Sequence, residues 1–155
     1  MAKAPRNQDP ENDVNTNCAR HTPSTDRGGI RAARKSTILG TAEPAFRGVP
    51  QRWTPEELLV ASVSQCHMLA VLALCSQKGI VVTAYTDHPS SAMAQTTDGG
   101  GYVTEVVLHP VVQIADQRHR DAVANVHERA HRQYFIADSL NVEVRWEAQV
   151  VVDSA

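Results

Sequence analysis

Hydrophobic and polar positions along the chain predict one long helix first of all. The longest apolar segment, residues 58–75, follows a TPEE sequence that begins at Thr54, and it is followed by Gly79. Thr54 suits the N-cap, proline is favoured at the first helical position, and Glu57 completes a capping box with Thr54. Gly79 suits the left-handed position that follows a helix. We therefore expect a helix of ~24 residues, ~36 Å long.

This helix is apolar on nearly every face, so we expect protein to surround it. Ser62, Ser64, Gln65 and His67 interrupt the apolar segment, which favours a buried core helix over a membrane span. A chain of 155 residues has little material to wrap such a helix. We therefore expect a second subunit to cover part of it.

The rest of the pattern predicts strands and one further helix. Strands are expected over 30–33, 36–39, 80–86, 102–114 and 141–152, with room for a short one at 92–95. Pro110 marks a bulge or an edge within its strand. Residues 115–134 predict a helix whose inner face carries Val123, Val126 and Ala130. This order of elements predicts an α+β protein.

Composition is that of a soluble globular protein, with 42% hydrophobic and 21% charged residues. We expect residues 1–20 to be a disordered tail and residues 21–155 to be a single domain. The net charge of -2 gives no electrostatic argument for a nucleic acid or membrane partner. No apolar signal segment is visible, and three cysteines at no zinc spacing favour a reducing cytoplasm.

Residues 127–131 read H-E-x-x-H, the motif of zinc peptidases. On a helix, His127 and His131 could bind one zinc ion, with Glu128 as general base. Arg129 and Arg132 disfavour a dication here, and no histidine follows the motif to supply a third ligand. We therefore expect no metal, and a zinc hydrolase is only a remote alternative.

Cys66 lies in the middle of the long helix. A buried cysteine is most often an inert small hydrophobe, and a chemical role needs a nearby cation that stabilises the thiolate. Cys75 is on the opposite face and ~13 Å away along the axis, too far for a disulfide. His67 points ~100° away from Cys66, so it is no base for that thiol. The candidate cations are arginines before the helix, such as Arg34 or Arg47.

The sequence TPEELLVASVSQCHML, from Thr54 onward, resembles the signature that opens the central helix of the OsmC/Ohr family of organic hydroperoxide reductases. AEPAFRG, KGIVVTAYTD and AHRQYFIADSLNVEV look like one OsmC-like subfamily, in the same order. The resemblance covers roughly residues 30–150. It implies an OsmC-like α+β fold, in which a long central helix and a second helix pack on an antiparallel-rich sheet. It also implies an intertwined homodimer with the active site at the dimer interface.

The resemblance further implies a thiol peroxidase that uses no cofactor. In the family, a cysteine thiolate attacks the peroxide and becomes a sulfenic acid, and a second cysteine then forms a disulfide that a dithiol reopens. Cys66 matches the attacking cysteine, and Glu56 matches a glutamate that orients an arginine beside the thiolate. Arg34 is the favoured match for that arginine and Arg31 the second, although the family's Arg-Asp-His is absent. Arg47 lies in a subfamily motif and would line the site.

The family's second cysteine is absent, because Tyr134 stands where the subfamily segment AHEQCFIANS has it. In the favoured interpretation, Cys66 reduces organic hydroperoxides and an external thiol or dithiol resolves the sulfenic acid. Tyr134 either donates a hydrogen bond there or fills a pocket wall. His131 lies one turn before it and faces either the pocket or solvent. The alternative is a degenerate protein that binds a lipophilic ligand or senses oxidation through Cys66.

Overall fold

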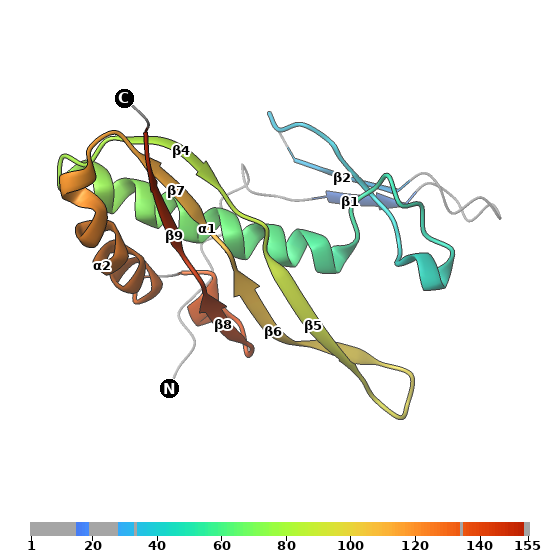
Figure 1. Cartoon of the computed structure of the whole chain (residues 1–155). Helices are drawn as coiled ribbons and strands as arrows, with labels where there is room; N and C mark the ends of the chain where they lie inside the picture. Colours follow the sequence, from blue (N-terminus) through green and yellow to red (C-terminus); the bar gives the residue numbers. More distant parts are fainter. Residues whose placement is uncertain (1–14, 19–27, 33, 134, 154–155) are drawn as a thin grey trace, which may run out of the picture. The chain divides into compact units, whose positions relative to one another are not determined.

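The computed structural model describes residues 15–18, 28–32, 34–133 and 135–153 (Figure 1). The chain forms two compact units, Met1–Leu58 and Leu59–Ala155. The first unit holds a three-stranded antiparallel sheet in the order β1-β2-β3. Its elements are β1 (Asn15–Cys18), β2 (Gly28–Arg31), β3 (Ile38–Gly40) and the short helix η2 (Pro44–Phe46).

Helix α1 (Pro55–Gln77) follows, with the ends that the sequence predicts. The backbone N–H of Thr54 donates to Glu57 Oε2 at 2.8 Å, and the N–H of Glu57 donates to Thr54 Oγ1 at 3.1 Å, which confirms the capping box. At the other end Gly79 has a φ of 67°. The N–H groups of Gly79 and Ile80 donate to the carbonyl oxygens of Ser76 and Cys75, so the helix closes in a Schellman motif.

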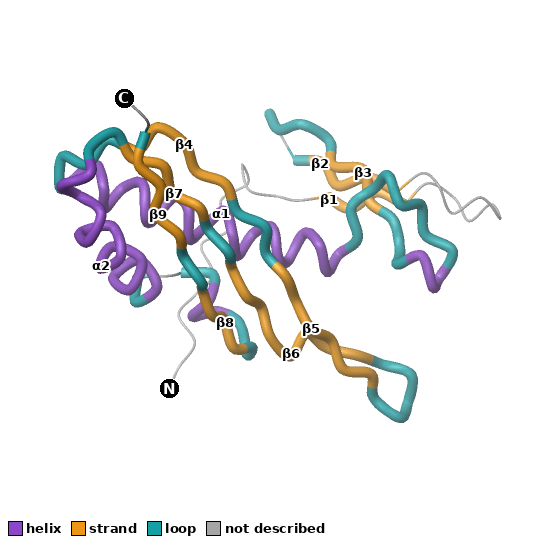
Figure 2. The backbone as a smooth tube through the Cα atoms, viewed as in Figure 1, coloured by secondary structure: helices purple, strands orange, loops and turns teal. Residues whose placement is uncertain are grey.

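The second unit holds two three-stranded sheets, ordered β4-β7-β9 and β5-β6-β8. The strands are β4 (Val82–Thr86), β5 (Ser90–Gln95), β6 (Gly101–Leu108), β7 (Val111–Ile114), β8 (Glu143–Trp146) and β9 (Gln149–Val152). The pairs β4/β7 and β5/β6 are antiparallel, while β6/β8 and β7/β9 are parallel. Figure 2 shows β4 leading into β5, β6 into β7 and β8 into β9 through short loops, and each of these steps passes from one sheet to the other.

Two long strands of the prediction are interrupted at these loops. The strand predicted over 102–114 divides at His109 and Pro110, because proline has no N–H to donate to a sheet. The strand predicted over 141–152 divides at Glu147 and Ala148. Here the N–H groups of Glu147 and Gln149 donate to the carbonyl oxygens of Leu108 and Pro110, so the pairing continues across the break.

Helix α2 (Arg120–His131) lies between β7 and β8 in the chain, between the short helices η3 (Gln117–His119) and η4 (Ala137–Ser139). Val123, Val126 and Ala130 are fully buried, as predicted. They pack with α1, β7 and Ile80 in one core cluster, formed by Val71, Leu74, Cys75, Ile80, Val112, Ile114, Val123, Val126 and Ala130. A second cluster contains Val60, Val63, Val106, Leu108 and Val144.

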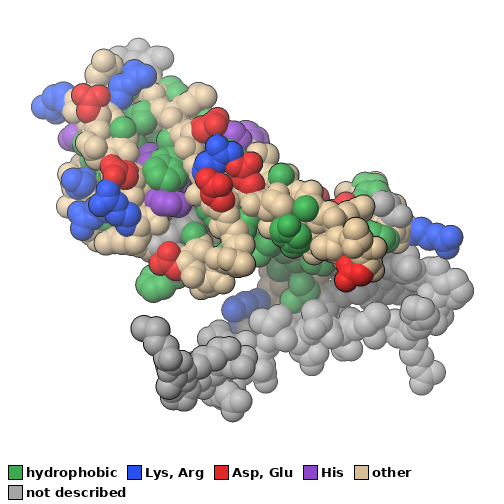
Figure 3. All heavy atoms as spheres, turned by 90° about the horizontal axis from the view of Figure 1, so that it is seen from below, with side chains coloured by type: hydrophobic (Ala, Val, Ile, Leu, Met, Phe, Trp, Pro, Cys, Tyr) green, Lys and Arg blue, Asp and Glu red, His purple; other side chains and the backbone are tan. Residues whose placement is uncertain are grey.

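The predicted α+β class is therefore confirmed: two helices pack on mixed, mostly antiparallel sheets. Of the tail predicted for residues 1–20, residues 1–14, 19 and 20 lie outside the described residues, and Asn15–Cys18 forms β1. The single domain over 21–155 stays a prediction. In Figure 3, positive and negative side chains are interspersed on the face shown, with hydrophobic side chains between them.

Among the described residues, α1 is long and apolar enough to cross a membrane, judged by length and composition alone. This is weak evidence, because the core helix of a soluble protein passes the same test. Helix α1 contributes residues to both core clusters and carries a buried histidine, His67. These contacts favour the core helix that the sequence predicts.

Candidate active site around Cys66

The thiol of Cys66 lies at the wall of an apolar hollow of about 670 Å³. Cys66 is half-buried and packs against the second core cluster. One wall of the hollow is a face of α1, and the other is the segment that follows α2. The lining residues are Cys66, Leu69, Ala70, Ala73, Leu74, Gln77, Gln133, Phe135 and Asp138. The thiol therefore borders a space that accepts an apolar molecule from solvent.

The α1 wall of this hollow is an exposed apolar face. Its residues recur every three or four positions, so they form one continuous stripe along the helix. Leu69 is 56% exposed and Ala73 is exposed. On the facing segment, Phe135 is 84% exposed. A helix face of this kind is left uncovered by the described residues of its own chain.

Cys75 has the opposite environment. It is 1% exposed, lies in the first core cluster, and burial raises the pKa of its thiol. Both Cys66 and Cys75 are free thiols. Cys66 packs against the second core cluster and Cys75 lies within the first. Cys75 is therefore enclosed in the core, where burial disfavours its thiolate.

His127, the first histidine of the H-E-x-x-H motif, is buried against α1. It is 1% exposed, and its Nδ1 lies 3.0 Å from Nε2 of His67, so one ring nitrogen donates a hydrogen bond to the other. The two rings stack, with centroids 5.3 Å apart. Burial, with the nearby charges of His127 and His131, lowers the pKa of His67 to about 3, and burial lowers the pKa of His127 to about 4. Both rings are therefore neutral near pH 7.

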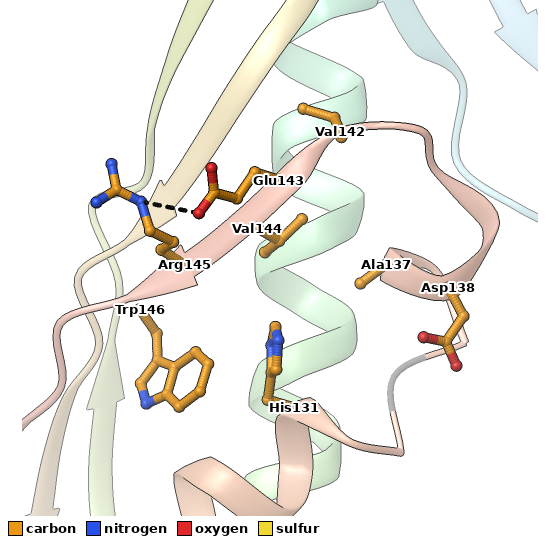
Figure 4. Close-up of a pocket in the computed structure, with 8 residues that line it drawn as sticks. All are labelled: His131, Ala137, Asp138, Val142, Glu143, Val144, Arg145 and Trp146. Carbon is orange, nitrogen blue, oxygen red and sulfur yellow. Dashed lines mark ion pairs between the residues drawn. The ribbon is translucent and has the colours of Figure 1, made fainter.

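His131, the second histidine of the motif, lines a separate hollow of about 430 Å³ (Figure 4). Its ring lies 4.3 Å, centroid to centroid, from the indole of Trp146. Figure 4 shows Val144 and Trp146 on the His131 side of β8, while Glu143 and Arg145 form an ion pair on its other side. Asp138 lines this hollow as well as the hollow at Cys66. His131 does not line the hollow at Cys66.

The motif does not assemble a metal centre within the described parts of the chain. No group of three or more His, Cys, Asp or Glu side chains lies together there in a way that could hold a metal ion. Glu128, the supposed general base, forms an ion pair with Arg132 one turn on. The remote zinc hydrolase alternative therefore has no ligand set in these residues.

The comparison with known families decides what kind of protein carries this thiol. The sequence model described as OsmC-like protein matches residues 48–148. This chain belongs to the OsmC-like protein family. The match includes α1 with Cys66, strands β4 to β8 and α2, and it confirms the resemblance seen in the TPEELLVASVSQCHML segment.

Solved structures of OsmC-like proteins have the same fold. An OsmC-like protein of unknown function from Vibrio cholerae is 26% identical with a TM-score of 0.77, over 88% of this chain and 98% of that chain. An organic hydroperoxide resistance protein from Elizabethkingia anophelis is 15% identical with a TM-score of 0.65, over 91% and 96%. The organic hydroperoxide resistance protein OhrB of Bacillus subtilis is 17% identical with a TM-score of 0.60, over 88% and 96%. No curated protein matches the chain.

Glu56, which the OsmC-like resemblance assigns to the site, lies in the first turn of α1. Its Oε2 is buried and has no hydrogen-bond partner among the described residues. A buried carboxylate oxygen without a donor is costly, so this atom calls for a cation or another donor. Glu56 belongs to the first unit and Cys66 to the second. The predicted role of Glu56 toward Cys66 therefore stays a prediction.

The three candidate arginines also lie in the first unit. Arg34 and Arg47 are exposed and have left-handed backbones, with φ of 61° and 66°. Residues other than glycine adopt this conformation at a cost, and such residues are enriched at functional sites. Arg31 lies in β2, and its side chain is outside the description. The choice among the three stays a prediction.

Tyr134, which the resemblance places where the family has its second cysteine, lies outside the described residues. Its neighbours Gln133 and Phe135 are both exposed and both line the hollow at Cys66. The main feature that sequence reasoning missed is the partner of His127, which is His67. The signal available for it was weak: each histidine lies on the inner side of an expected helix, 60 residues apart.

Proposed function

We propose that this OsmC-like protein reduces organic hydroperoxides through the thiol of Cys66, and that an external thiol resolves the oxidised cysteine. One observation carries the proposal: the Cys66 thiol borders an apolar hollow that is open to solvent. Membership of the family supports it, as do two relatives of the same fold that are named organic hydroperoxide resistance proteins.

The first step is an attack of the Cys66 thiolate on one oxygen of the hydroperoxide. A sulfur–oxygen bond forms, the oxygen–oxygen bond breaks, and the alkoxide leaves as an alcohol after taking up a proton. Sulfur is oxidised by two electrons to a sulfenic acid, and the peroxide is reduced by the same two. The apolar lining of the hollow favours substrates whose organic part is apolar, because their burial removes apolar surface from water.

The second step replaces the family's internal disulfide. An external thiolate attacks the sulfur of the sulfenic acid, water leaves, and a mixed disulfide with Cys66 forms. A second thiol group then displaces Cys66 and restores its thiol. Tyr134 takes the place of the second cysteine and donates a hydrogen bond at the site or fills its wall. The open hollow supports this route, because an outside reductant has to reach the sulfur.

We assign the thiolate-stabilising cation to Arg34, with Arg31 as the second choice and Arg47 at the wall of the site. The unpartnered Oε2 of Glu56 supports a guanidinium in this place. A homodimer is the expected assembly, because the exposed apolar face of α1 needs a cover and the active site would lie at its interface. A reducing cytoplasm suits a catalytic thiol of this kind.

A second candidate function shares the same hollow. Without an internal resolving cysteine, Cys66 can be oxidised once and hold its sulfenic acid, as an oxidation sensor does. If Cys66 does not react with peroxide, the apolar hollow beside it would instead suit a protein that binds a lipophilic ligand. Both differ from the peroxidase in one observable, which is repeated consumption of hydroperoxide.

The experiment mixes the reduced protein with cumene hydroperoxide and dithiothreitol, and follows loss of the peroxide. In parallel, a sulfenic acid trap such as dimedone is added and the modified residue is identified by mass spectrometry. Many turnovers with the trap on Cys66 support the peroxidase. A trapped Cys66 without turnover supports the sensor and contradicts the enzyme. An unreactive Cys66 contradicts both and leaves the ligand-binding function.

A further inference from the structure

The buried contact between His67 and His127 has a feature that packing alone does not require. Two imidazole rings stack between α1 and α2, with a hydrogen bond of 3.0 Å and an exposed fraction of at most 1% each. Two leucines would fill a comparable space with no cost of removing polar atoms from water. Unlike two leucines, the imidazole pair also restrains the relative orientation of α1 and α2, because a buried hydrogen bond permits only a narrow range of distance and angle.

This restraint on orientation affects Cys66 because of the residues that lie next to each histidine in the chain. His67 is the next residue of α1 after Cys66 and points into the core, where its hydrogen bond to His127 adds a directional contact to the apolar packing of α1. Four residues after His127, α2 ends, and the chain passes into the wall of the hollow with Gln133, Phe135 and Asp138. The two histidines therefore join the helix that carries the thiol to the helix that carries the facing wall.

A further contact extends this arrangement to the sheet. The indole of Trp146, at the end of β8, lies 6.4 Å from the ring of His67 and 4.3 Å from the ring of His131, centroid to centroid. Three elements of the second unit, α1, α2 and β8, thus meet at one cluster of rings: His67, His127, His131 and Trp146. None of these four residues lines the hollow at Cys66, so the cluster acts on the thiol only through the backbone.

Burial keeps the pair neutral, and the ionisable groups around it modify the pKa of each ring. His131 on α2 lowers the pKa of His67, while Asp87, before β5, opposes the lowering at His127. Asp87 itself accepts hydrogen bonds from Ser64 Oγ of α1 at 2.5 Å and from the N–H of His109 at 2.7 Å. Because burial is the largest effect on both rings, the hydrogen bond persists through the neutral pH range.

We propose that His67 and His127 are positioning residues, whose mutual hydrogen bond sets the place of the Cys66 thiol relative to the wall formed by Gln133, Phe135 and Asp138. The proposal deepens the function proposed for Cys66, since it assigns two residues that align the thiol with its binding hollow. The expected consequence is that the hydrogen bond, and not only the filled space, determines which molecules reach the thiol.

The test compares two reagents with the same reactive group. N-cyclohexylmaleimide is apolar and 3-maleimidopropionic acid is charged, and the rate of modification of Cys66 by each is followed by mass spectrometry of the whole chain. The ratio of the two rates cancels any change in the fraction of thiolate. In the native protein the ratio is expected to exceed that of free cysteine, because the hollow at Cys66 is apolar.

Two double variants distinguish an effect on the position of the Cys66 thiol from an effect on the stability of the fold. In His67→Leu with His127→Leu, both polar partners are removed together, so stability is expected to be kept or raised. The reagent ratio is expected to fall about tenfold toward the value for free cysteine, since small displacements at a reacting centre change rates by such factors. In His67→Gln with His127→Asn, the amides can restore a hydrogen bond, and the ratio is expected within about twofold of the native value.

Each outcome decides the proposal. A folded leucine pair that keeps the native ratio would overturn it, as would a folded Gln/Asn pair whose ratio falls as far as that of the leucine pair. His88→Leu, at an exposed position, is the control and is expected to leave the ratio unchanged. If the native protein shows the high ratio but consumes no cumene hydroperoxide, the positioning holds and only the proposed peroxidase function fails.

Discussion

The two faces of helix α1 differ sharply although they are built from similar residues. On one face Val63, Val71 and Cys75 are almost fully buried against the chain's own sheets and α2. On the other, Leu69 is more than half exposed and Cys66 borders an open hollow. One helix thus supplies both the core and the candidate site, and packing, rather than residue type, separates an enclosed cysteine from one that borders an open hollow.

The two cysteines of α1 provide the largest expected effect. Cys66→Ser is expected to abolish consumption of cumene hydroperoxide, because a serine hydroxyl is not ionised at neutral pH. Cys75→Ser is expected to keep the activity and to lower the free energy of unfolding by about 1–3 kcal/mol, because it places a hydroxyl in an apolar cluster. Peroxide assays and urea unfolding of both variants check this. The contrast between the two cysteines is contradicted if Cys75→Ser abolishes peroxide consumption and Cys66→Ser keeps it.

Acid is expected to weaken the buried face next. His67 and His127 have pKa values of about 3 and about 4 when folded, below the 6.5 of an unfolded histidine. The unfolded chain therefore takes up protons first, so stability is complete above about pH 7 and falls as pH decreases below 6.5. Between pH 7 and pH 5.5 the loss is expected to be about 2–3 kcal/mol for the two rings together.

Urea unfolding at a series of pH values measures this loss. The variant with leucine at both positions is the matched control, because it lacks the two titrating rings. It is expected to show a much flatter dependence on pH in this range. An equally steep dependence in the control would show that other groups cause the acid sensitivity.

Truncation of two aliphatic residues of α1 is expected to give a smaller difference in the free energy of unfolding. Val71→Ala is expected to lower the free energy of unfolding by about 2 kcal/mol, because the valine is fully buried in the first core cluster. Leu69→Ala is expected to change the stability of the subunit by no more than about 0.5 kcal/mol. If a second copy covers this face, the same change weakens the dimer, which sedimentation measures. An unchanged dimer would show that the open face of α1 is not its interface.

The cap of α1 gives the smallest effect. Thr54→Ala removes the hydroxyl that accepts from the N–H of Glu57, and it is expected to lower the free energy of unfolding by about 1 kcal/mol. Thr86→Ala, at an exposed position on β4, is the control, with a change of about 0.5 kcal/mol or less. Urea unfolding of both variants measures the difference, and equal effects would show that the cap adds nothing.

Local patterns alone were enough to predict much of this molecule. The capping box at Thr54 and the turn at Gly79 depend only on neighbouring residues, so they are readable along the chain. The inner face of α2 was readable because polar residues occupy its outer face. The TPEELLVASVSQCHML segment indicated the family before any fold was known.

Only the tertiary structure decided which face of α1 is buried. Apolar residues lie all around this helix, so its sequence pattern has no preferred side. The parallel pairs β6/β8 and β7/β9 and the contact between His67 and His127 join residues that are tens of positions apart, and no local rule determines such partners. The sequence by itself therefore determined the elements, the family and the cysteine to examine. Packing decided that Cys66 borders an open hollow while Cys75 is enclosed, because exposure depends on what the rest of the chain covers.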